Sequence, residues 1–156
     1  MNLDRALRKL TTGIYIVTTK QESQINGMVA SWVSQVSFSP PLLMIAVKKE
    51  RYSHQMITAG KVFALNILST QQKKEVPLFK GTHTPEDKFF NTPYEIKKTG
   101  SPIIKDALAY LDCVLIDQFT PGDHTLFIGE VIEGDVLNDG DPLSSHELEH
   151  IYGGIL

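Results

Sequence analysis

The sequence predicts a mainly β protein, an antiparallel β-barrel with short peripheral helices. About five or six segments are rich in β-branched and aromatic residues, and most of them follow one another directly along the chain. Glycine, proline and asparagine mark the turns between them. The chain has 156 residues, of which 42% are apolar. That is enough for one core and short for two, so we expect a single domain over residues 1–156.

The first elements are predicted from periodicity and caps. Leucine and alanine recur at helical spacing near the N-terminus and predict an amphipathic helix over 3–10, capped by Asn2. Strands are expected over 13–20 and 27–38, and the apolar residues on both faces of the second indicate burial on both sides or a bend. The prolines at 40 and 41 end that strand. A buried strand over 42–47 follows, and then a short helix that Ser53 caps and that stops near Gly60.

The second half continues the same pattern. A strand is expected over 62–68, after which Ser69 caps a polar helix that Pro77 limits. The segment 79–102 predicts a long excursion with one helical turn at 86–89 and a strand at 94–97, and long loops are usually functional or disordered. Two long strands are expected over 107–119 and 125–137, joined by a Pro-Gly-Asp turn. An acidic loop over 138–142 follows, and a last helix starts at Ser144 or Ser145.

Composition excludes several classes of protein. Lysine and arginine number 15 against 18 aspartates and glutamates, a net charge of −3, which excludes a protein that coats nucleic acid or an anionic membrane. The single cysteine, Cys113, excludes a disulfide framework or a thiolate metal cluster and is expected to be an inert core thiol. The longest apolar run, 42–47, is too short to cross a bilayer, and no signal peptide is recognisable. We expect a cytoplasmic protein.

One motif favours a different chemistry. His146, Glu147 and His150 match H-E-x-x-H, in which two imidazoles one helical turn apart bind zinc beside a glutamate base. No ligand type follows the motif, so a third ligand would have to come from elsewhere, such as His124 or Asp123. A solvated helix face is the simpler interpretation. We therefore predict no metal site and keep a small zinc hydrolase as an alternative.

Two local features indicate a ligand site. Cationic and hydroxyl side chains gather between the strand 42–47 and the start of the next helix, at Lys48, Lys49, Arg51, Ser53 and His54. Such a set at a helix N-terminus suits a phosphate, although a solvated charged loop without a ligand would have the same sequence pattern. Small residues in the preceding strand, at Ala30, Ser31, Ser34 and Ser37, leave room for a ligand beside the backbone, although a barrel corner would also use them.

Four segments carry a resemblance to a known family. They are Gly-Met-Val-Ala-Ser-Trp at 27–32, Val-Ser-Phe-Ser-Pro-Pro-Leu-Leu-Met-Ile-Ala-Val at 36–47, Arg-Tyr-Ser-His at 51–54 and Gly-Asp-His-Thr-Leu-Phe-Ile-Gly-Glu-Val at 122–131. In order and spacing they resemble the flavin reductase-like family with the FMN-binding split barrel. That family includes flavoredoxin-type electron carriers and the small reductase components of two-component monooxygenases. The resemblance implies a Greek-key split β-barrel, a homodimer and one FMN per subunit near the dimer interface.

The resemblance also implies a set of cofactor-binding residues. Backbone groups of Val29, Ala30 and Ser31 would face the flavin, and the side chains of Ser34 and Gln35 would hydrogen-bond to it. The phosphate would lie in the segment already singled out as an anion site, at Lys48 or Lys49, Arg51, Tyr52, Ser53 and His54. Trp32 would stack at the flavin edge, cover the pocket or belong to the core. His124 would lie near the flavin or the nicotinamide, unless it is simply a histidine at a strand end.

The function that the resemblance implies is an NAD(P)H-dependent flavin reductase. It would pass hydride from NADH or NADPH to FMN, or alternatively FAD, and electrons on to a redox acceptor protein, free flavin or oxygen. A flavin supplies its own redox chemistry, so the lack of an acid–base pair in the sequence is consistent with this function. Besides the zinc hydrolase, the alternatives are an electron carrier without NAD(P)H activity and a barrel without a cofactor. Neither nucleic acid nor a membrane is expected as a partner.

Overall fold

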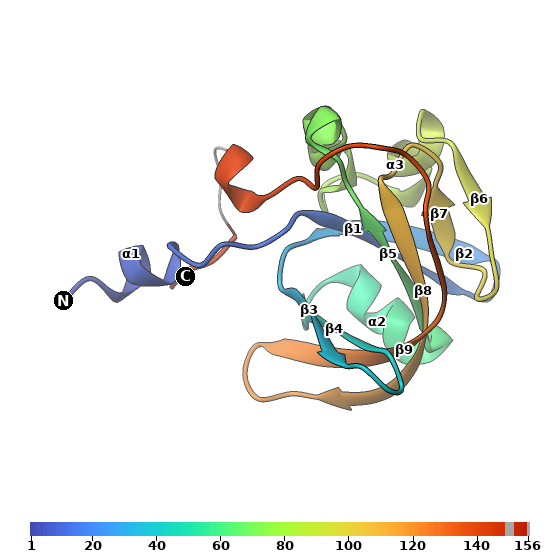
Figure 1. The fold of residues 1–156 in the computed structure, drawn as a ribbon. Coiled ribbons are helices and arrows are strands. Elements are labelled where there is room, and N and C mark those ends of the chain that lie inside the picture. The colour runs from blue at the N-terminus through green and yellow to red at the C-terminus, as the bar shows by residue number, and fades with distance from the viewer. Residues whose placement is uncertain (149–151, 156) are drawn as a thin grey trace.

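The computed structural model describes residues 1–148 and 152–155 and is built around one antiparallel sheet (Figure 1). Its strand order is β2-β1-β5-β8-β9-β4-β3. The strands are β1 (Tyr15–Gln21), β2 (Gln24–Ala30), β3 (Val33–Ser37), β4 (Leu42–Lys48), β5 (Val62–Ile67), β8 (Ala109–Phe119) and β9 (His124–Val136). The order is linear and ends at β2 and β3, so the barrel is split between these strands rather than closed. The mainly β class and the split barrel are confirmed.

The segment predicted as one strand over 27–38 is two strands. β2 ends at Ala30 and β3 begins at Val33, so that Ser31 and Trp32 form the step between the two edges of the sheet. The Trp32 carbonyl still accepts a hydrogen bond from the backbone N–H of Ala46 on β4, at 2.9 Å. Of the two explanations for apolar residues on both faces, the bend is therefore the correct one, and it puts Ser31 and Trp32 at the split.

The long strands β8 and β9 form the hairpin that the Pro-Gly-Asp turn predicts. Their register shifts between Asp112 and Cys113 and again between Leu115 and Asp117. Bulges of this kind increase the local twist, which helps long strands to curl around a barrel. β9 also pairs along its first half with β4, from Lys48 opposite His124 to Leu42 opposite Glu130. The pairing brings the charged end of β4 beside the start of β9.

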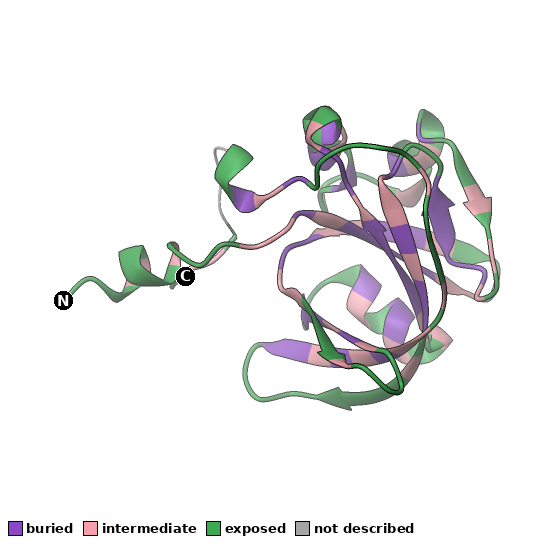
Figure 2. Ribbon diagram, in the orientation of Figure 1, coloured by how far each residue is buried: buried purple, intermediate pink, exposed green. Residues whose placement is uncertain are grey.

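The barrel interior is a compact apolar core. Side chains from six strands meet there, including Val17, Ile45, Phe63, Cys113 and Phe127. Figure 2 shows the buried segments of these strands in purple. Burial, with Asp112 nearby, raises the pKa of the Cys113 thiol to about 12. The thiol therefore stays protonated, as expected for an inert core cysteine.

A second apolar cluster lies under the 3-10 helix η1 (Thr70–Phe79), where Val76 and Phe79 pack against Ile16 and Leu68. Ser69 caps this helix, as predicted, in a capping box with Gln72. The prediction that Pro77 ends the helix is wrong. A proline lacks only the donor, and its carbonyl still accepts from the Lys80 N–H, at 3.4 Å, so the turn continues to Phe79.

Helix α2 (Tyr52–Gly60) begins two residues earlier than a cap at Ser53 would allow. Its N-cap is Arg51, so the prediction that Ser53 is the cap is wrong. The Ser53 side chain instead turns inward, is buried, and accepts a hydrogen bond from Asn26 Nδ2 at 3.2 Å. A tertiary contact with β2 therefore replaces the local cap.

The segment 79–102 is ordered and largely as predicted. It holds α3 (Pro85–Phe90), capped by Thr84, and β6 (Tyr94–Ile96). β6 pairs with β7 (Pro102–Ile104) in a separate two-stranded sheet that the sequence did not indicate. No helix among the described residues is long and apolar enough to span a bilayer.

Both chain ends project from the barrel as one arm (Figure 1). α1 (Leu3–Leu7) is shorter than the predicted helix over 3–10, and Asn2 caps it as predicted, accepting from the Arg5 N–H. The Asp4 carboxylate accepts from the Ile155 N–H at 2.8 Å and so joins the two ends. None of the α1 side chains is buried, and Leu10 is 66% exposed. The arm therefore presents its apolar residues to solvent.

Candidate functional site

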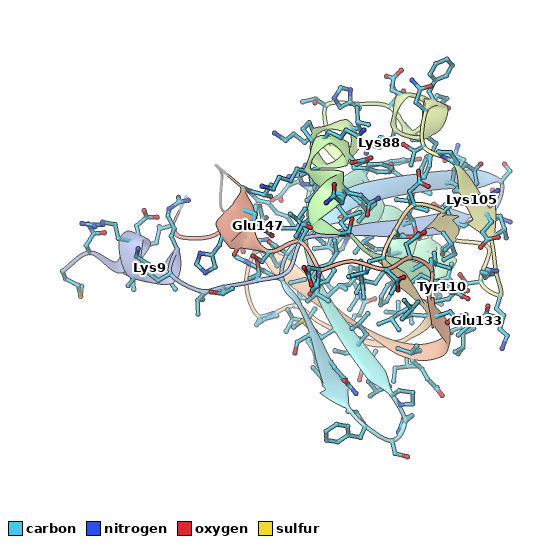
Figure 3. The ribbon with its side chains drawn as sticks, turned by 45° about the horizontal axis from the view of Figure 1, so that its top comes forward. Lys9, Lys88, Lys105, Tyr110, Glu133 and Glu147 are labelled. Carbon is cyan, nitrogen blue, oxygen red and sulfur yellow. The ribbon has the colours of Figure 1, made fainter. Side chains whose placement is uncertain are left out.

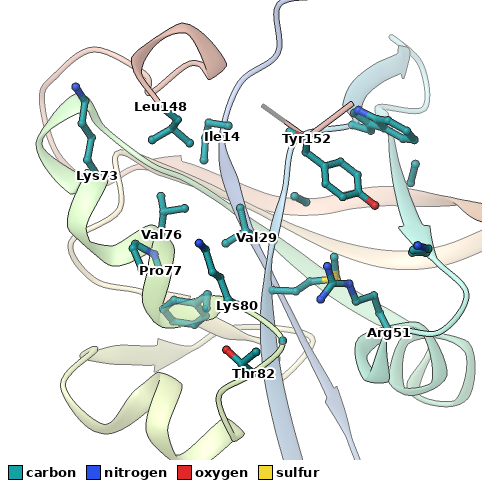
Figure 4. Close-up of a pocket in the computed structure, with 18 residues that line it drawn as sticks. Ile14, Val29, Arg51, Lys73, Val76, Pro77, Lys80, Thr82, Leu148 and Tyr152 are labelled. Atoms are coloured by element: carbon teal, nitrogen blue, oxygen red, sulfur yellow. The ribbon is translucent and has the colours of Figure 1, made fainter. Parts of the chain in front are cut away.

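A cavity of about 790 Å³ lies between η1 and the split edge of the barrel (Figure 4). Figure 4 shows Lys73, Val76 and Pro77 of η1 on one side and Arg51 and Tyr152 on the other. Volumes of several hundred Å³ and mostly apolar walls are typical of small-molecule sites. The cavity is therefore the candidate functional site.

The split between β2 and β3 brings six of the predicted cofactor residues to this cavity. These residues line it: Val29, Ala30, Ser31, Trp32, Lys48 and Arg51. The five remaining predicted residues are absent from the lining among the described residues: Ser34, Gln35, Tyr52, Ser53 and His54. Their roles toward a cofactor stay predictions.

Ser34 and Gln35 lie on the exposed strand β3. The Ser34 hydroxyl donates to the Gln35 carbonyl, and Gln35 Nε2 donates to the Ser37 carbonyl. These local bonds leave both side chains outside the cavity wall. The sequence could not show this, because it did not fix where the strand over 27–38 bends.

Tyr52 and His54 occupy the first turn of α2, but neither lines the cavity. Tyr52 Oη donates to Gln24 Oε1 at 2.8 Å. His54 Nε2 lies 2.6 Å from Thr125 Oγ1, and its ring packs 5.1 Å from that of Phe127. Helical geometry explains the arrangement, since neighbouring residues on a helix point to different sides.

One buried hydroxyl in the cavity wall has no partner. Ser31 Oγ, in a residue only 6% exposed, makes no hydrogen bond among the described residues. Leaving a buried donor or acceptor unpaired costs about 1–3 kcal/mol, so such groups in native sites generally face a ligand or water. Ser31 therefore marks a position where a bound molecule would receive a hydrogen bond.

The charge of the cavity has one sign. Four lining residues are cationic, Lys48, Arg51, Lys73 and Lys80, and none of the described lining residues is acidic. Lys73 lies in η1 and Lys80 is the C-cap of that helix. Sequence reasoning missed both, because only the fold brings η1 to the split edge. The net charge of −3 conceals this local excess. The lining favours an anionic ligand with a large apolar body.

An aromatic cluster lies on the same side of the cavity as Arg51. The Trp32 ring lies 4.6 Å from that of His124 and 5.2 Å from that of Tyr152. Of the three roles predicted for Trp32, a place in the barrel core is excluded, because Trp32 is only half-buried and lines the cavity. Sequence reasoning assigned no chemistry to Tyr152, whose neighbours in space lie far from it along the chain.

His124 lies behind Tyr152, at the first residue of β9. Its Nδ1 is 2.6 Å from Asp123 Oδ1, and its Nε2 is 2.7 Å from Tyr152 Oη. Because a carboxylate only accepts, His124 Nδ1 donates to Asp123. The bond to His124 lowers the pKa of Asp123, and burial raises the pKa of Tyr152. His124 thus fixes the phenol that lines the cavity.

The pKa of His54 gives a pH-dependent prediction. Burial, and secondarily Lys49, lower its pKa below the usual 6.5. As the pH drops through about 6.5, His54 becomes protonated in the unfolded chain before it does so in the folded chain. The free energy of unfolding therefore falls over this range and levels off below the folded pKa. Urea unfolding should show this loss in the wild type and less of it in His54→Gln.

The control for this measurement is His83→Gln, which removes an exposed histidine and should keep the wild-type pH dependence. Asp4 and Asp123, whose pKa values are lowered, act at lower pH, from about pH 4 downward, and do not obscure the window. Equal pH dependence in all three proteins would contradict the assignment to His54.

The H-E-x-x-H motif does not form a zinc site in the described residues. Only Ser145–Glu147 are helical (η2, a 3-10 turn), and Leu148 is already extended. His146 Nε2 lies 2.7 Å from Thr11 Oγ1, and Glu147 accepts from the Ser144 N–H at 3.0 Å. His150 lies outside the described residues. Among the residues described, no three metal-ligating side chains come together, so nothing supports the zinc hydrolase alternative.

The fold is a split antiparallel barrel with a large cationic cavity at its open edge. This combination is that of a small barrel that binds a cofactor. Residues 7–150 match the family described as "Flavin reductase like domain". The chain belongs to this family, as the resemblance predicted.

Three relatives illustrate the match. The chain is 35% identical over 148 residues, 90% of its length, to the high molecular weight rubredoxin of Moorella thermoacetica, of which it covers 62%. It is 36% identical over 135 residues to the NADH-dependent FAD reductase of Streptomyces globisporus, covering 85% of this chain and 74% of the relative. The structure of the NADH:FAD oxidoreductase of Streptomyces globisporus with NAD and FAD fragments superposes with a TM-score of 0.80 at 33% identity, covering 88% of this chain and 82% of that one.

Several other relatives are much longer proteins. The chain covers 23 to 26% of the length of diflavin flavoproteins from Nostoc and Synechocystis. It therefore corresponds to one part of these proteins.

Proposed function

We propose that this protein binds a flavin in the cavity and reduces it with NADH or NADPH. The observation that carries the proposal is the cavity itself, which combines apolar and aromatic walls, an unpaired Ser31 hydroxyl and a cationic end without an acidic residue among those described. An isoalloxazine ring with a phosphorylated side chain has the matching chemistry. The FAD reductase of Streptomyces globisporus and the complex with NAD and FAD fragments support the same function.

The residues divide the binding between them. The backbone from Val29 to Ser31 would lie along the ring, with Ser31 Oγ as a hydrogen-bonding group, and Lys48 and Arg51 would hold the phosphate. Trp32 and Tyr152 would shield one side of the ring from water. The flavin, when bound, supplies the hydride-accepting chemistry, so the protein need only bind and orient it.

The flavin that we propose is FMN, with FAD as the alternative. FMN carries one phosphate, which Arg51 and Lys48 together would bind. Lys73 and Lys80, on the η1 side of the cavity, would be available to the second phosphate of FAD. Titration with both flavins distinguishes the two, since FAD should lose affinity in Lys73→Ala and Lys80→Ala while FMN should not.

Anaerobic mixing of the flavin-loaded protein with NADH and with NADPH tests the reductase activity. The visible absorbance of the bound flavin should bleach with at least one of the two. A flavin that stays oxidised with both but is reduced by a protein donor would instead make this chain an electron carrier. For the onward electrons we propose free flavin or a redox acceptor protein, and for the compartment the cytoplasm.

We also propose that the chain is a homodimer. The arm formed by α1 and the C-terminal residues presents Leu3 and Leu10 to solvent, and Phe119 and Val136 are exposed on the long hairpin. Several exposed apolar side chains on a projecting arm support the proposal that a second copy of the chain packs against them.

Light scattering after size exclusion should give twice the chain mass for the wild type. Leu10→Glu should shift the protein toward the monomer, because it puts a charge into the apolar contact. Lys9→Glu, which changes the exposed neighbour, should remain dimeric. A monomeric wild type would refute the homodimer.

A further inference from the structure

Lys88 is a cation that the fold buries. It lies on α3 (Figure 3) and is 4% exposed. Its Nζ donates to Asn26 Oδ1 at 3.0 Å and to the Gly27 carbonyl at 2.8 Å, both on β2. Lysine is rarely buried to this extent without a charged partner, because removing an ammonium group from water is costly.

No negative side chain offsets this charge in the described residues. No carboxylate among them forms an ion pair with Lys88, and its two acceptors are neutral. Burial lowers the pKa of Lys88, and the charge of another cation, Arg51, lowers it further. The two like charges repel each other, and nothing within the described part of the chain relieves that repulsion.

Lys88 is connected to the start of α2 by buried hydrogen bonds. Asn26 accepts from Lys88 through Oδ1 and donates through Nδ2 to Ser53 Oγ. Ser53 is the second residue of α2, and Arg51 is its N-cap without a side-chain cap bond. The positive end of the helix dipole at the start of α2 also favours an anion, so it adds to the charges of Lys88 and Arg51.

We propose that Lys88 is the buried counter-charge for the phosphate group of the bound flavin, positioned through Asn26 and Ser53, and that it makes the site select phosphorylated flavins over riboflavin. This inference rests on the proposed function. A phosphate beside Arg51 at the start of α2 would pair with Arg51, and its negative charge would offset the repulsion between the two cations. Lys88 is a positioning residue here, because it acts through Asn26 and through charge rather than by lining the cavity.

The test compares FMN with riboflavin, which differ only in the phosphate. Lys88→Met keeps the length and volume of the side chain and removes the charge. It should weaken FMN binding by about tenfold or more, in line with the loss of a charge-assisted interaction, and leave riboflavin binding within about threefold. The control Lys105→Met removes an exposed lysine outside the cavity lining and should change neither affinity.

A second measurement uses the wild type alone. Burial lowers the pKa of Lys88 below the usual 10.5, and binding of the phosphate should raise it again. FMN binding should therefore take up protons at some pH between neutral and about 10.5, and riboflavin binding should not. Calorimetry in buffers of different ionisation enthalpy measures this uptake, and it remains decisive if Lys88→Met does not fold. Lys88→Met should abolish the uptake.

Equal losses of FMN and riboflavin affinity in Lys88→Met would mean that Lys88 only supports the fold, and this would overturn the proposal. So would FMN binding by the wild type without proton uptake anywhere between neutral pH and about 10.5. In both cases flavin binding itself would stand. A wild type that binds neither flavin would instead overturn the proposed function, and the role of Lys88 with it.

Discussion

Arg51→Ala should weaken FMN binding by about 10- to 100-fold, which corresponds to about 1.5–3 kcal/mol for a charge-assisted contact. Arg51 lines the cavity, is the N-cap of α2 and has Gly81 directly against its guanidinium group. Its planar group suits a phosphate through two parallel hydrogen bonds, and alanine leaves nothing in their place. A fluorescence titration of the flavin measures the effect.

The matched control is Lys105→Ala, which removes a positive charge at an exposed position outside the cavity lining. It should bind FMN as the wild type does. If both variants bind equally well, the basic segment at 48–54 is only a solvated loop. Higher salt should also weaken FMN binding to the wild type more than to Arg51→Ala, because one ionic contact is missing in the variant.

Asn66→Ala should reduce the free energy of unfolding by about 2–4 kcal/mol, since each buried group left unpaired costs about 1–3 kcal/mol. Asn66 is fully buried on β5. Its Nδ2 donates to the Ile16 carbonyl at 3.1 Å and its Oδ1 accepts from the Ile104 N–H at 2.8 Å. One side chain thus joins β5 to β1 and to β7, and alanine would orphan partners on both.

Urea unfolding measures this loss of stability. Asn91→Ala, at the exposed end of α3, is the control and should change stability by less than about 1 kcal/mol. A loss in Asn66→Ala as small as in the control would show that these hydrogen bonds contribute little. Retained flavin binding in Asn66→Ala at low temperature would show that the residue acts on the fold rather than on the cavity.

Local patterns in the sequence were sufficient for most of the barrel. The hairpin of β8 and β9 follows from two long β-branched runs and a Pro-Gly-Asp turn, and the caps at Asn2 and Ser69 follow from the preference of short polar side chains for helix starts. Both depend on residues close together in the chain. The cationic segment that contains Lys48 and Arg51, both of which line the cavity, was also visible, because the two residues lie close together in the chain.

Features that depend on distant contacts were not predictable in this way. Ser53 is a residue type that often caps helices, but its hydroxyl instead accepts a hydrogen bond from Asn26 on β2. Lys88 looks like any surface lysine in sequence, and only the docking of α3 on β2 buries it. Tyr152 reaches His124 across 28 positions. In each case tertiary packing decides between options that local chemistry leaves open.

The most direct measurement is the visible spectrum and flavin content of the purified protein after incubation with FMN or FAD and removal of the free flavin. We predict a yellow protein that retains about one flavin per chain, with a spectrum shifted from that of free flavin because the ring lies in an apolar cavity. A colourless protein that takes up neither flavin would contradict the proposed function.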